Sequence, residues 1–510
     1  MMPLGRGPGG SAVVPRNAIS VVSYSSQAFI GAVQSASGAA RSSTTANQVH
    51  YLADYLARLN TKSLLIESHY IDRHFIEEYA KYYSRCLVQP PNSCVRIHAF
   101  SVDLSGHRVT ELLRLAARGP LDASHVKEQL QGGYLGFIVI RPLPFVPVGR
   151  TVLVPPSASG SDRMHTLVSY PVHLLGLQLS VKGIAFQQQD HAVGACATTA
   201  LWTALQRLTR NEGGRAPTPA AVTEAASRRY SPEGRLIPSG GLSSNQISEA
   251  LREFEFGPQV FRPANPEFFR LLTGIYLRSG IPVIMGIQLE NGEHHALTAI
   301  GYRERTTPGA AEAFSTIDGN SGRVRLTNKD LTTLIVHDDR IGPYVLGTLS
   351  QRGSDLFLSI RWGDGQKERL RILMAFAPLY PKLRTTASQL VRRMKNILLL
   401  VHDTFRVRSG TTLDVDMFFE RAGSYLGSLN TMNLSPIRVA AFQQTAALSR
   451  YVAIIRWSIG GLGLIDTVWD TTDTIRYTRI TEQMLAVVAL SKTSEPYTDS
   501  LAKYFSVAVG

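Results

Sequence analysis

Cysteine is scarce in this sequence, which contains only Cys86, Cys94 and Cys196 among 510 residues. An odd number of widely spaced cysteines argues against the disulfide framework of a small secreted protein. Long apolar runs are missing too, and those present, such as ILLLV at 397–401, are far too short to cross a bilayer. Residues 1–20 lack the apolar stretch that a signal peptide needs. The sequence therefore predicts a soluble, cytoplasmic protein with no membrane partner.

Charged residues make up only 18% of the chain, but Lys and Arg outnumber Asp and Glu by 53 to 39, so the net charge is +14. Such a balance is compatible with a nucleic acid, an anionic membrane or an acidic partner. The basic residues are scattered, however, and the chain has neither a basic tail nor an aromatic-and-basic motif of the RNA-binding type. Nucleic-acid binding stays open without a motif to support it, and a basic soluble surface is the simpler interpretation.

Length and residue patterning divide the chain into four parts, without an internal repeat. Residues 1–48 are rich in Gly, Ser and Ala, which predicts a flexible leader. Strand and helix patterns follow each other over 49–164, which indicates an α/β region. Helical patterns precede a run of strands over 165–365, which is typical of an α+β domain. The remainder, 366–510, mixes both patterns, and we expect one of its helices over 414–429.

Cys196 lies in the stretch DHAVGACATTALW, after small residues and before a run of good helix formers. A thiol in the first turn of a helix lies near unpaired backbone N–H groups and the positive end of the helix dipole. Both favour the thiolate form. A small buried cysteine in an apolar helix is the commoner alternative. This stretch alone does not decide between a nucleophile and a core residue.

His295 opens the second of two apolar runs in SGIPVIMGIQLENGEHHALTAIGYR. The Asn-Gly pair between the runs predicts a β-hairpin, whose returning strand would hold the imidazole rigidly. A carboxylate at a strand end can accept the imidazole N–H and fix its orientation. The strand TLIVHDD ends in Asp338 and Asp339, whereas Asp318, in the turn-like stretch STIDGNSG, is a third candidate.

Three glutamines, Gln187, Gln188 and Gln189, precede the expected cysteine helix. A side-chain amide there, together with the backbone N–H of Cys196, can receive the oxyanion that develops when a carbonyl is attacked.

A metal site is the weaker interpretation of the remaining candidates. Cys86, Cys94 and His98 offer three zinc ligands, but their spacing is not a standard one and no fourth ligand lies nearby. Val-His-Asp occurs at 336–338 and 401–403, which resembles the His-Asp pairs of metal phosphohydrolases, but no further His pattern precedes the first pair. We expect neither a metal nor an organic cofactor.

The order of the motifs resembles that of the papain-like cysteine peptidases, and among them the C39-like peptidase group. The resemblance covers about residues 185–345: a glutamine, a cysteine opening a helix, the helix GLSSNQISEAL, the strands SGIPVIMGI and HALTAIGY, and a strand ending in Asp. It implies a papain-like fold over 165–365, with a helical half that carries the nucleophile and an antiparallel β half. By position, it implies four roles: nucleophile for Cys196, general base and acid for His295, orienting carboxylate for Asp338 and oxyanion glutamine for Gln189.

The resemblance implies a cysteine peptidase or isopeptidase that acts on a peptide or protein through an acyl-enzyme. Two alternatives stay open. The same Cys-His pair can serve acyl transfer or deamidation, and a catalytically silent relative can bind protein or nucleic acid. Asp190 stands six residues before Cys196, where the family usually has its glutamine.

Overall fold

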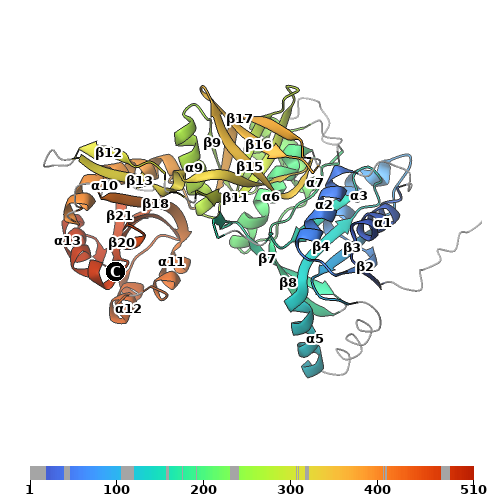
Figure 1. Ribbon diagram of the computed structural model, residues 1–510, viewed down its shortest axis with the longest axis horizontal. Helices are drawn as coiled ribbons and strands as arrows, with labels where there is room; N and C mark the ends of the chain where they lie inside the picture. Colours follow the sequence, from blue (N-terminus) through green and yellow to red (C-terminus); the bar gives the residue numbers. More distant parts are fainter. Residues whose placement is uncertain are drawn as a thin grey trace, which may run out of the picture.

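The structure is a computed structural model of the chain, with a mixed α+β architecture. The residues that it describes are 19–39, 46–104, 120–156, 160–174, 176–190, 192–193, 195–229, 241–305, 307, 309–315, 321–363, 365–405, 407, 411–432, 434–472 and 483–509. Figure 1 shows a central β-barrel with an N-terminal sheet, in blue, on one side and a C-terminal sheet, in orange to red, on the other. No helix in the described part is long and apolar enough to span a membrane.

The N-terminal sheet has five antiparallel strands in sequence order. They are β1 (Ile19–Ser23), β2 (Ser63–Tyr70), β3 (Cys94–Phe100), β4 (Tyr134–Ile140) and β5 (Val148–Leu153). The helices of this region are α1 (Ser26–Ser37), α2 (Asn47–Arg58), α3 (Arg73–Lys81), the 3-10 turn η1 (Tyr83–Arg85) and α5 (Pro120–Gly133).

Both faces of this sheet are buried, as β4 illustrates. Phe137 and Val139 point into the core that is shared with the centre of the molecule, whereas Ile138 and Ile140 point into the core beneath α1 and α2. Successive side chains of a strand alternate between its two faces, so an apolar run without polar interruption fits a strand covered on both sides.

The start of the chain differs from the expected flexible leader over 1–48. β1 pairs with β2, and α1 is capped by Ser25 at its N-terminus. Phe29 and Val33, four residues apart in an otherwise Ser- and Ala-rich helix, are buried. Two apolar positions at helical spacing are enough to anchor this helix to the core. Residues 1–18 and 40–45 lie outside the described part of the chain.

Six antiparallel strands form the central barrel, in the order β10-β11-β14-β15-β16-β17, and β10 pairs back with β17 to close it. They are β10 (Val283–Gln288), β11 (His294–Glu304), β14 (Leu331–Asp338), β15 (Gly342–Arg352), β16 (Asp355–Arg361) and β17 (Lys367–Leu379). β9 (Gly257–Phe261) pairs with β17, and the short β6 (Asp162–Arg163) pairs with β11. The predicted Asn-Gly hairpin between β10 and β11 is confirmed, with Gly292 at a φ of 88°.

Four helices and a hairpin accompany the barrel. They are α6 (Cys196–Asn211), α7 (Pro219–Ser227), α8 (Ser244–Glu253) and α9 (Pro266–Arg278), with β7 (Val168–Leu174) and β8 (Leu177–Gly183). α6 packs on β10, β11 and β14, and it is buried almost all round, with Trp202 fully enclosed. A helix with so little exposed surface is a core element, and its ends are fixed by their surroundings.

The C-terminal sheet has seven strands in the order β12-β13-β18-β19-β20-β21-β22. They are β12 (Glu312–Ser315), β13 (Ser321–Leu326), β18 (Thr412–Arg421), β19 (Tyr451–Ile459), β20 (Leu462–Asp470), β21 (Met484–Ala489) and β22 (Ala508–Val509). The helices are α10 (Ala387–Thr404), α11 (Ala422–Leu429), α12 (Pro436–Thr445) and α13 (Glu495–Phe505), with the 3-10 turns η2 (Thr327–Lys329) and η4 (Lys492–Ser494).

The expected boundary between the third and fourth regions differs from the observed one in two ways. β17 closes the barrel, so the barrel extends past residue 365 to Leu379. Residues 312–326, which lie between barrel strands in sequence, instead form β12 and β13 of the C-terminal sheet, where β13 pairs in parallel with β18. Both differences come from pairing between distant segments, which a local pattern does not encode.

Candidate functional site

A buried histidine and two carboxylates meet at one end of the barrel. His295, the second residue of β11, donates from Nε2 to Asp338 Oδ1 at 3.0 Å, and the same nitrogen lies 3.3 Å from Asp339 Oδ1. The side chains of all three residues are at most 4% exposed. β11 pairs directly with β14, which ends at Asp338, so the hairpin and the strand end predicted from the sequence are neighbours in the sheet.

Arg340 holds the Asp338 carboxylate as well. Its backbone N–H and its Nε donate to Asp338 Oδ1 at 3.0 and 3.2 Å, and its Nη2 donates to Oδ2 at 2.9 Å. Arg340 Nη1 in turn binds Glu368 at 3.1 Å. A guanidinium that binds both oxygens of a carboxylate fixes its plane as well as its charge. Sequence reasoning missed Arg340, although it directly follows the Asp338–Asp339 pair.

These contacts set the charge of the imidazole. Burial on its own lowers the pKa of His295, but Asp338 and Asp339 outweigh burial and raise that pKa well above its ordinary value. Burial raises the pKa of Asp338, but His295 and Arg340 together bring it far below its usual range. At neutral pH, Asp338 is therefore ionised and His295 carries a proton on each ring nitrogen. Nε2 faces the carboxylates, so Nδ1 is the nitrogen left for another partner.

Cys196 is the first residue of α6 and is half-buried. The direction of α6 relative to β11 follows from three hydrogen bonds. Thr298 Oγ1 donates to the carbonyl of Ala200 at 2.8 Å. Further along, Arg207 of α6 and Ile300 of β11 both bind the segment 166–167. α6 and β11 therefore run in the same direction, side by side.

This arrangement places the starts of both elements at the same end of the barrel. Cys196 lies one helical turn before Ala200, and His295 lies three residues before Thr298. The first turn of α6, with its unpaired backbone N–H groups, thus lies toward the end of the barrel where β11 begins. The structure brings His295 and Asp338 into contact and sets Cys196 at the same end of this packed pair.

The glutamines before α6 have different surroundings. Gln187 is buried and donates to Glu78 Oε1 at 3.0 Å, and Gln188 is buried and accepts from the Val148 N–H at 3.2 Å. Both side chains are thus engaged in the interface with the N-terminal region. Gln189 is half-buried, and its side chain forms no hydrogen bond with any residue that the structure describes.

Asp190 shapes the loop that leads to Cys196. Its Oδ1 accepts the N–H groups of Ala192 and Val193 at 3.0 and 2.8 Å, and its Oδ2 accepts the hydroxyl of Tyr83 at 2.9 Å. A carboxylate that binds the backbone two and three residues ahead stabilises a turn. Asp190 therefore organises the approach to the helix, a role that the sequence did not indicate.

A buried charge cluster lies behind this turn. Arg141 Nη1 is 3.6 Å from Asp190 Oδ2 and 3.5 Å from Glu78 Oε2, and all three side chains are almost completely inaccessible to solvent. α3 contributes Glu78, and the segment after β4 contributes Arg141. One guanidinium thus faces two carboxylates, and burial raises the pKa of Glu78 to about 8, with Arg141 opposing and Asp190 adding to the shift.

We predict that Glu78→Gln changes the pH dependence of stability. The pKa of Glu78 rises from 4.5 in the unfolded chain to about 8, so folding takes up a proton between these values and stability falls as pH rises through that window. The introduced glutamine does not titrate, so the variant does not lose stability in this way. The difference in unfolding free energy between variant and wild type should therefore shift in favour of the variant as pH rises from about 5 to about 8. Urea unfolding at both pH values measures the difference. Glu77→Gln, on the same helix but partly exposed, should show no such gain, and an equal gain in both variants would refute the assignment to Glu78.

α2 of the N-terminal region fixes the turn that follows Asp338. Gln48 Nε2 donates to the carbonyl of Asp339 at 2.8 Å, and the Tyr51 hydroxyl donates to the carbonyl of Pro343 at 2.7 Å. A Cβ on Gly342 would lie 2.1 Å from the Tyr51 ring, so only glycine allows this close approach. The two carboxylates are therefore held by the barrel and by the N-terminal region together.

The other sequence candidates that the structure describes do not join this group. Asp318 lies outside the described residues. The Cys86 thiol lies 3.8 Å from the carbonyl of Tyr82, and the His98 ring binds Tyr134 and Glu67. Within the described ranges, the only set of three side chains whose ligand atoms lie close enough for a metal is His295, Asp338 and Asp339.

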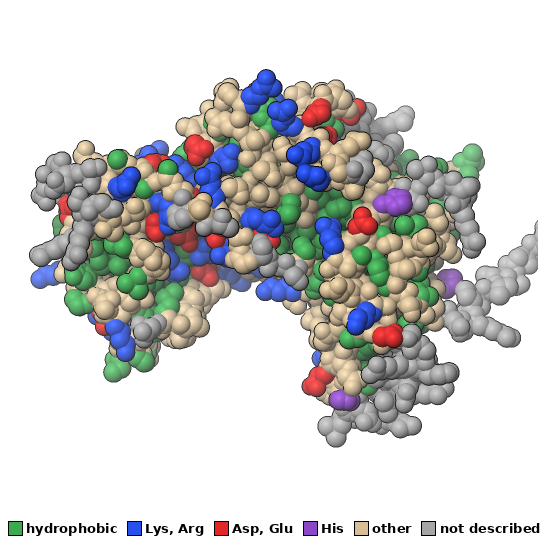
Figure 2. Space-filling view, in the orientation of Figure 1, with side chains coloured by type: hydrophobic (Ala, Val, Ile, Leu, Met, Phe, Trp, Pro, Cys, Tyr) green, Lys and Arg blue, Asp and Glu red, His purple; other side chains and the backbone are tan. Residues whose placement is uncertain are grey.

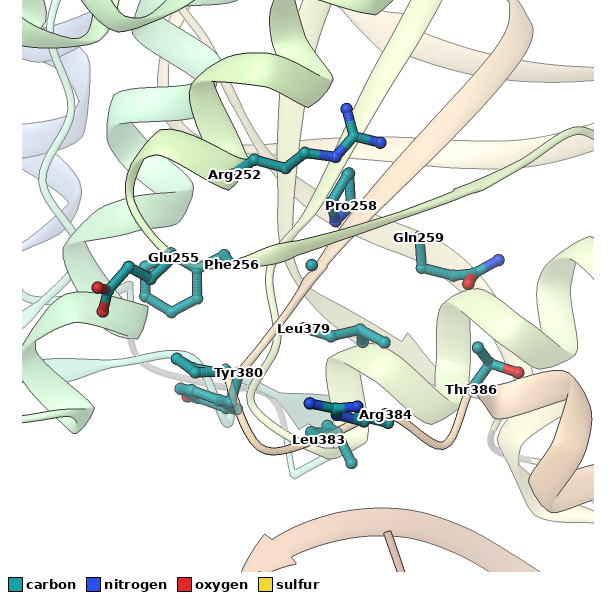
Figure 3. Close-up of a pocket in the computed structure, with 12 residues that line it drawn as sticks. Arg252, Glu255, Phe256, Pro258, Gln259, Leu379, Tyr380, Leu383, Arg384 and Thr386 are labelled. Carbon is teal, nitrogen blue, oxygen red and sulfur yellow. The ribbon is translucent and has the colours of Figure 1, made fainter. Parts of the chain in front are cut away.

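A hollow of about 460 Å³ lies elsewhere on the central region, between α8, β9 and the segment after β17 (Figure 3). The rings of Phe256 and Tyr380 meet there edge to face, with centroids 6.2 Å apart. Its lining includes none of the residues singled out from the sequence for chemistry. We therefore place the candidate site at the end of the barrel that carries His295.

A scan against protein-family models finds no match to this chain, and a search of curated proteins finds no matching sequence. The assignment of a function therefore depends on the geometry of the site.

Proposed function

We propose that the chain is a papain-like thiol hydrolase that cleaves a peptide or isopeptide bond. The observation that carries this proposal is the buried His295–Asp338 pair, whose histidine lies on β11, the strand that runs alongside α6, the helix that begins with Cys196. A helix start that holds a cysteine beside a β-barrel that holds a histidine is the papain-like arrangement, and the mixed α+β architecture with a closed antiparallel barrel agrees with it.

In the proposed reaction the Cys196 thiolate attacks the carbonyl carbon, and the C–S bond forms as the carbonyl electrons move to oxygen. The backbone N–H of Cys196 and the amide of Gln189 receive this oxyanion. His295 then gives its Nδ1 proton to the leaving nitrogen, and the C–N bond breaks. Water attacks the thioester, His295 takes up its proton, and the acid product leaves with the thiolate restored. Asp338 keeps the ring oriented and its charge balanced throughout.

A metal ion held by His295, Asp338 and Asp339 is the competing interpretation of the same side chains. The position of Arg340 argues against it, because its guanidinium binds both oxygens of Asp338 and repels a second cation there. Treatment with a chelator distinguishes a thiol mechanism from a metal-dependent one. Under the proposal, a strong chelator leaves the hydrolysis rate unchanged, whereas loss of hydrolysis that a divalent metal restores would favour the metal.

We predict that Cys196 reacts fastest of the three thiols with an electrophilic peptide probe. Cys94 is buried, and burial raises the pKa of its thiol, so it should label slowly in the folded protein. Cys86 is half-buried like Cys196 but lies beside a carbonyl oxygen and does not begin a helix, which makes it the matched control. Peptide mapping after timed labelling measures the three rates. Equal rates at Cys196 and Cys86 would contradict the proposal.

A further inference from the structure

A groove of about 930 Å³ lies between α2 of the N-terminal region and the outer face of the barrel. Tyr51, Asp54 and Arg58 form the wall on α2. Residues of β15, β16 and the turn into β17 form the other wall, including Leu346, Arg361, Trp362 and Lys367. A groove of this volume is within the range of small-ligand sites.

The groove has an excess of positive charge. Arg58, Arg361 and Lys367 are exposed, and none of them forms an ion pair with any of the described residues, whereas Asp54 is the one acidic side chain in the lining. Arg369 is exposed on the neighbouring strand, with its guanidinium 5.6 Å from the Phe357 ring. Figure 2 shows several Lys and Arg side chains over the top of the barrel, with a few acidic side chains among them. The groove is therefore complementary to an anion.

Two half-buried aromatic rings, Tyr51 and Trp362, lie among these cations. Arg58 lies 5.6 Å from the centre of the Tyr51 ring, and Arg340 lies 5.4 Å from that of Trp362. Aromatic rings beside basic side chains suit a ligand that combines a planar base with phosphate.

The sheet topology disfavours an extended peptide in this groove. β15 is paired with β14 and β16, and β16 is paired with β15 and β17, so neither wall strand has a free edge. A peptide that adds a strand needs such an edge for its backbone hydrogen bonds. A nucleoside phosphate needs only rings and cations.

We propose that this groove binds a nucleoside phosphate, either free or within a single-stranded nucleic acid. Trp362 Nε1 donates to Glu368 Oε2 at 3.1 Å, and Glu368 binds Arg340, which holds Asp338. A ligand that stacks on Trp362 therefore contacts a chain of hydrogen bonds that leads to the histidine. This coupling rests on the proposed hydrolase function, whereas binding itself does not.

The fluorescence of Trp362 reports whether a ligand occupies the groove. The chain has four tryptophans, and Trp202, Trp457 and Trp469 are fully buried, so quenching by a ligand in the groove acts on Trp362. The full-length protein is titrated with the four nucleoside monophosphates, an oligothymidylate, inorganic phosphate and a poly-glutamate peptide. The Trp362→Phe variant corrects for absorption by the ligand. We expect a nucleotide or the oligonucleotide to quench, and which of them binds tighter identifies the source of the ligand.

The double variant Arg361→Gln, Lys367→Gln should weaken this binding at least about tenfold, since it removes two contacts to phosphate. The control, Arg352→Gln with Lys382→Gln, removes the same charge from exposed positions outside the lining. Equal weakening in both variants, quenching by poly-glutamate alone, or no quenching by any nucleotide would overturn the proposal. Binding that persists in Cys196→Ala separates this proposal from the fate of the hydrolase assignment.

Discussion

Replacement of Cys196 by alanine is expected to abolish peptide hydrolysis, with a loss of about 10⁴-fold or more, because no other group at the site can form the acyl-enzyme. Folding should be unaffected. Cys196 is half-buried in the first turn of α6, and alanine is the best helix former, so the change in unfolding free energy should stay within about 1 kcal/mol. The measurements are release of free carboxylate from a peptide library and thermal unfolding of the same preparation.

Cys86→Ala is the matched control for this variant, because it removes a half-buried thiol that lies against the carbonyl of Tyr82. It should retain full hydrolysis. Hydrolysis that survives in Cys196→Ala would show that the nucleophile lies elsewhere. Formation of a new isopeptide or ester product by the wild type, in place of a free acid, would instead favour acyl transfer at the same cysteine.

Asp338→Asn is expected to reduce kcat about 10³- to 10⁴-fold, since the neutral amide neither holds the imidazolium nor fixes its tautomer. Asp339→Asn should cost less than about tenfold. The reason is geometric: Asp338 is closer to His295 Nε2 and is itself held by Arg340, whereas Asp339 Oδ2 has no hydrogen-bond partner among the described residues. Kinetics of the two variants, which carry the same chemical change at adjacent positions, decide between the carboxylates. A larger loss in Asp339→Asn would reverse the assignment.

The pH profile gives this pair of variants a second readout. Asp338 raises the pKa of His295, so its removal should lower that pKa and move the alkaline limb of the kcat/KM profile to lower pH. A variant that lost activity only through damage to the fold would show a lower plateau without this displacement. Both variants should therefore be compared over the whole profile as well as at one pH.

The parts of the site that the sequence predicted are the ones encoded locally. Cys196 lies at a helix start because small residues precede a helical run, and His295 lies at a strand start because an Asn-Gly turn fixes the hairpin before it. The residues that surround them could not be predicted. Arg141, Glu78 and Tyr83 contact the loop before α6 from distant parts of the chain, and no local pattern predicts such a cluster.

The errors in the fold have the same origin. A helix was expected over 414–429, but residues up to Arg421 form β18, and only Ala422–Leu429 are helical. β18 is paired on both edges, with β13 and β19, and its side chains are mostly buried on both faces. The apolar run from Met417 to Phe419 fits a buried helix equally well when its pairing partners are unknown.

Because β12 and β13 belong to the C-terminal sheet, the order in which strands are synthesised differs from the order in which they can pair. β13 is made before β14, the strand that ends at Asp338, but its partner β18 emerges only some ninety positions later, with Arg323 aligned to Thr412. The barrel cannot close until β17, the partner of β10, has been synthesised. Pairings that span so much chain form slowly. A ribosome-bound nascent chain thus already carries its cysteine, histidine and carboxylates while the scaffold that would align them is unfinished, and maturation is timed by the translation of the C-terminal part.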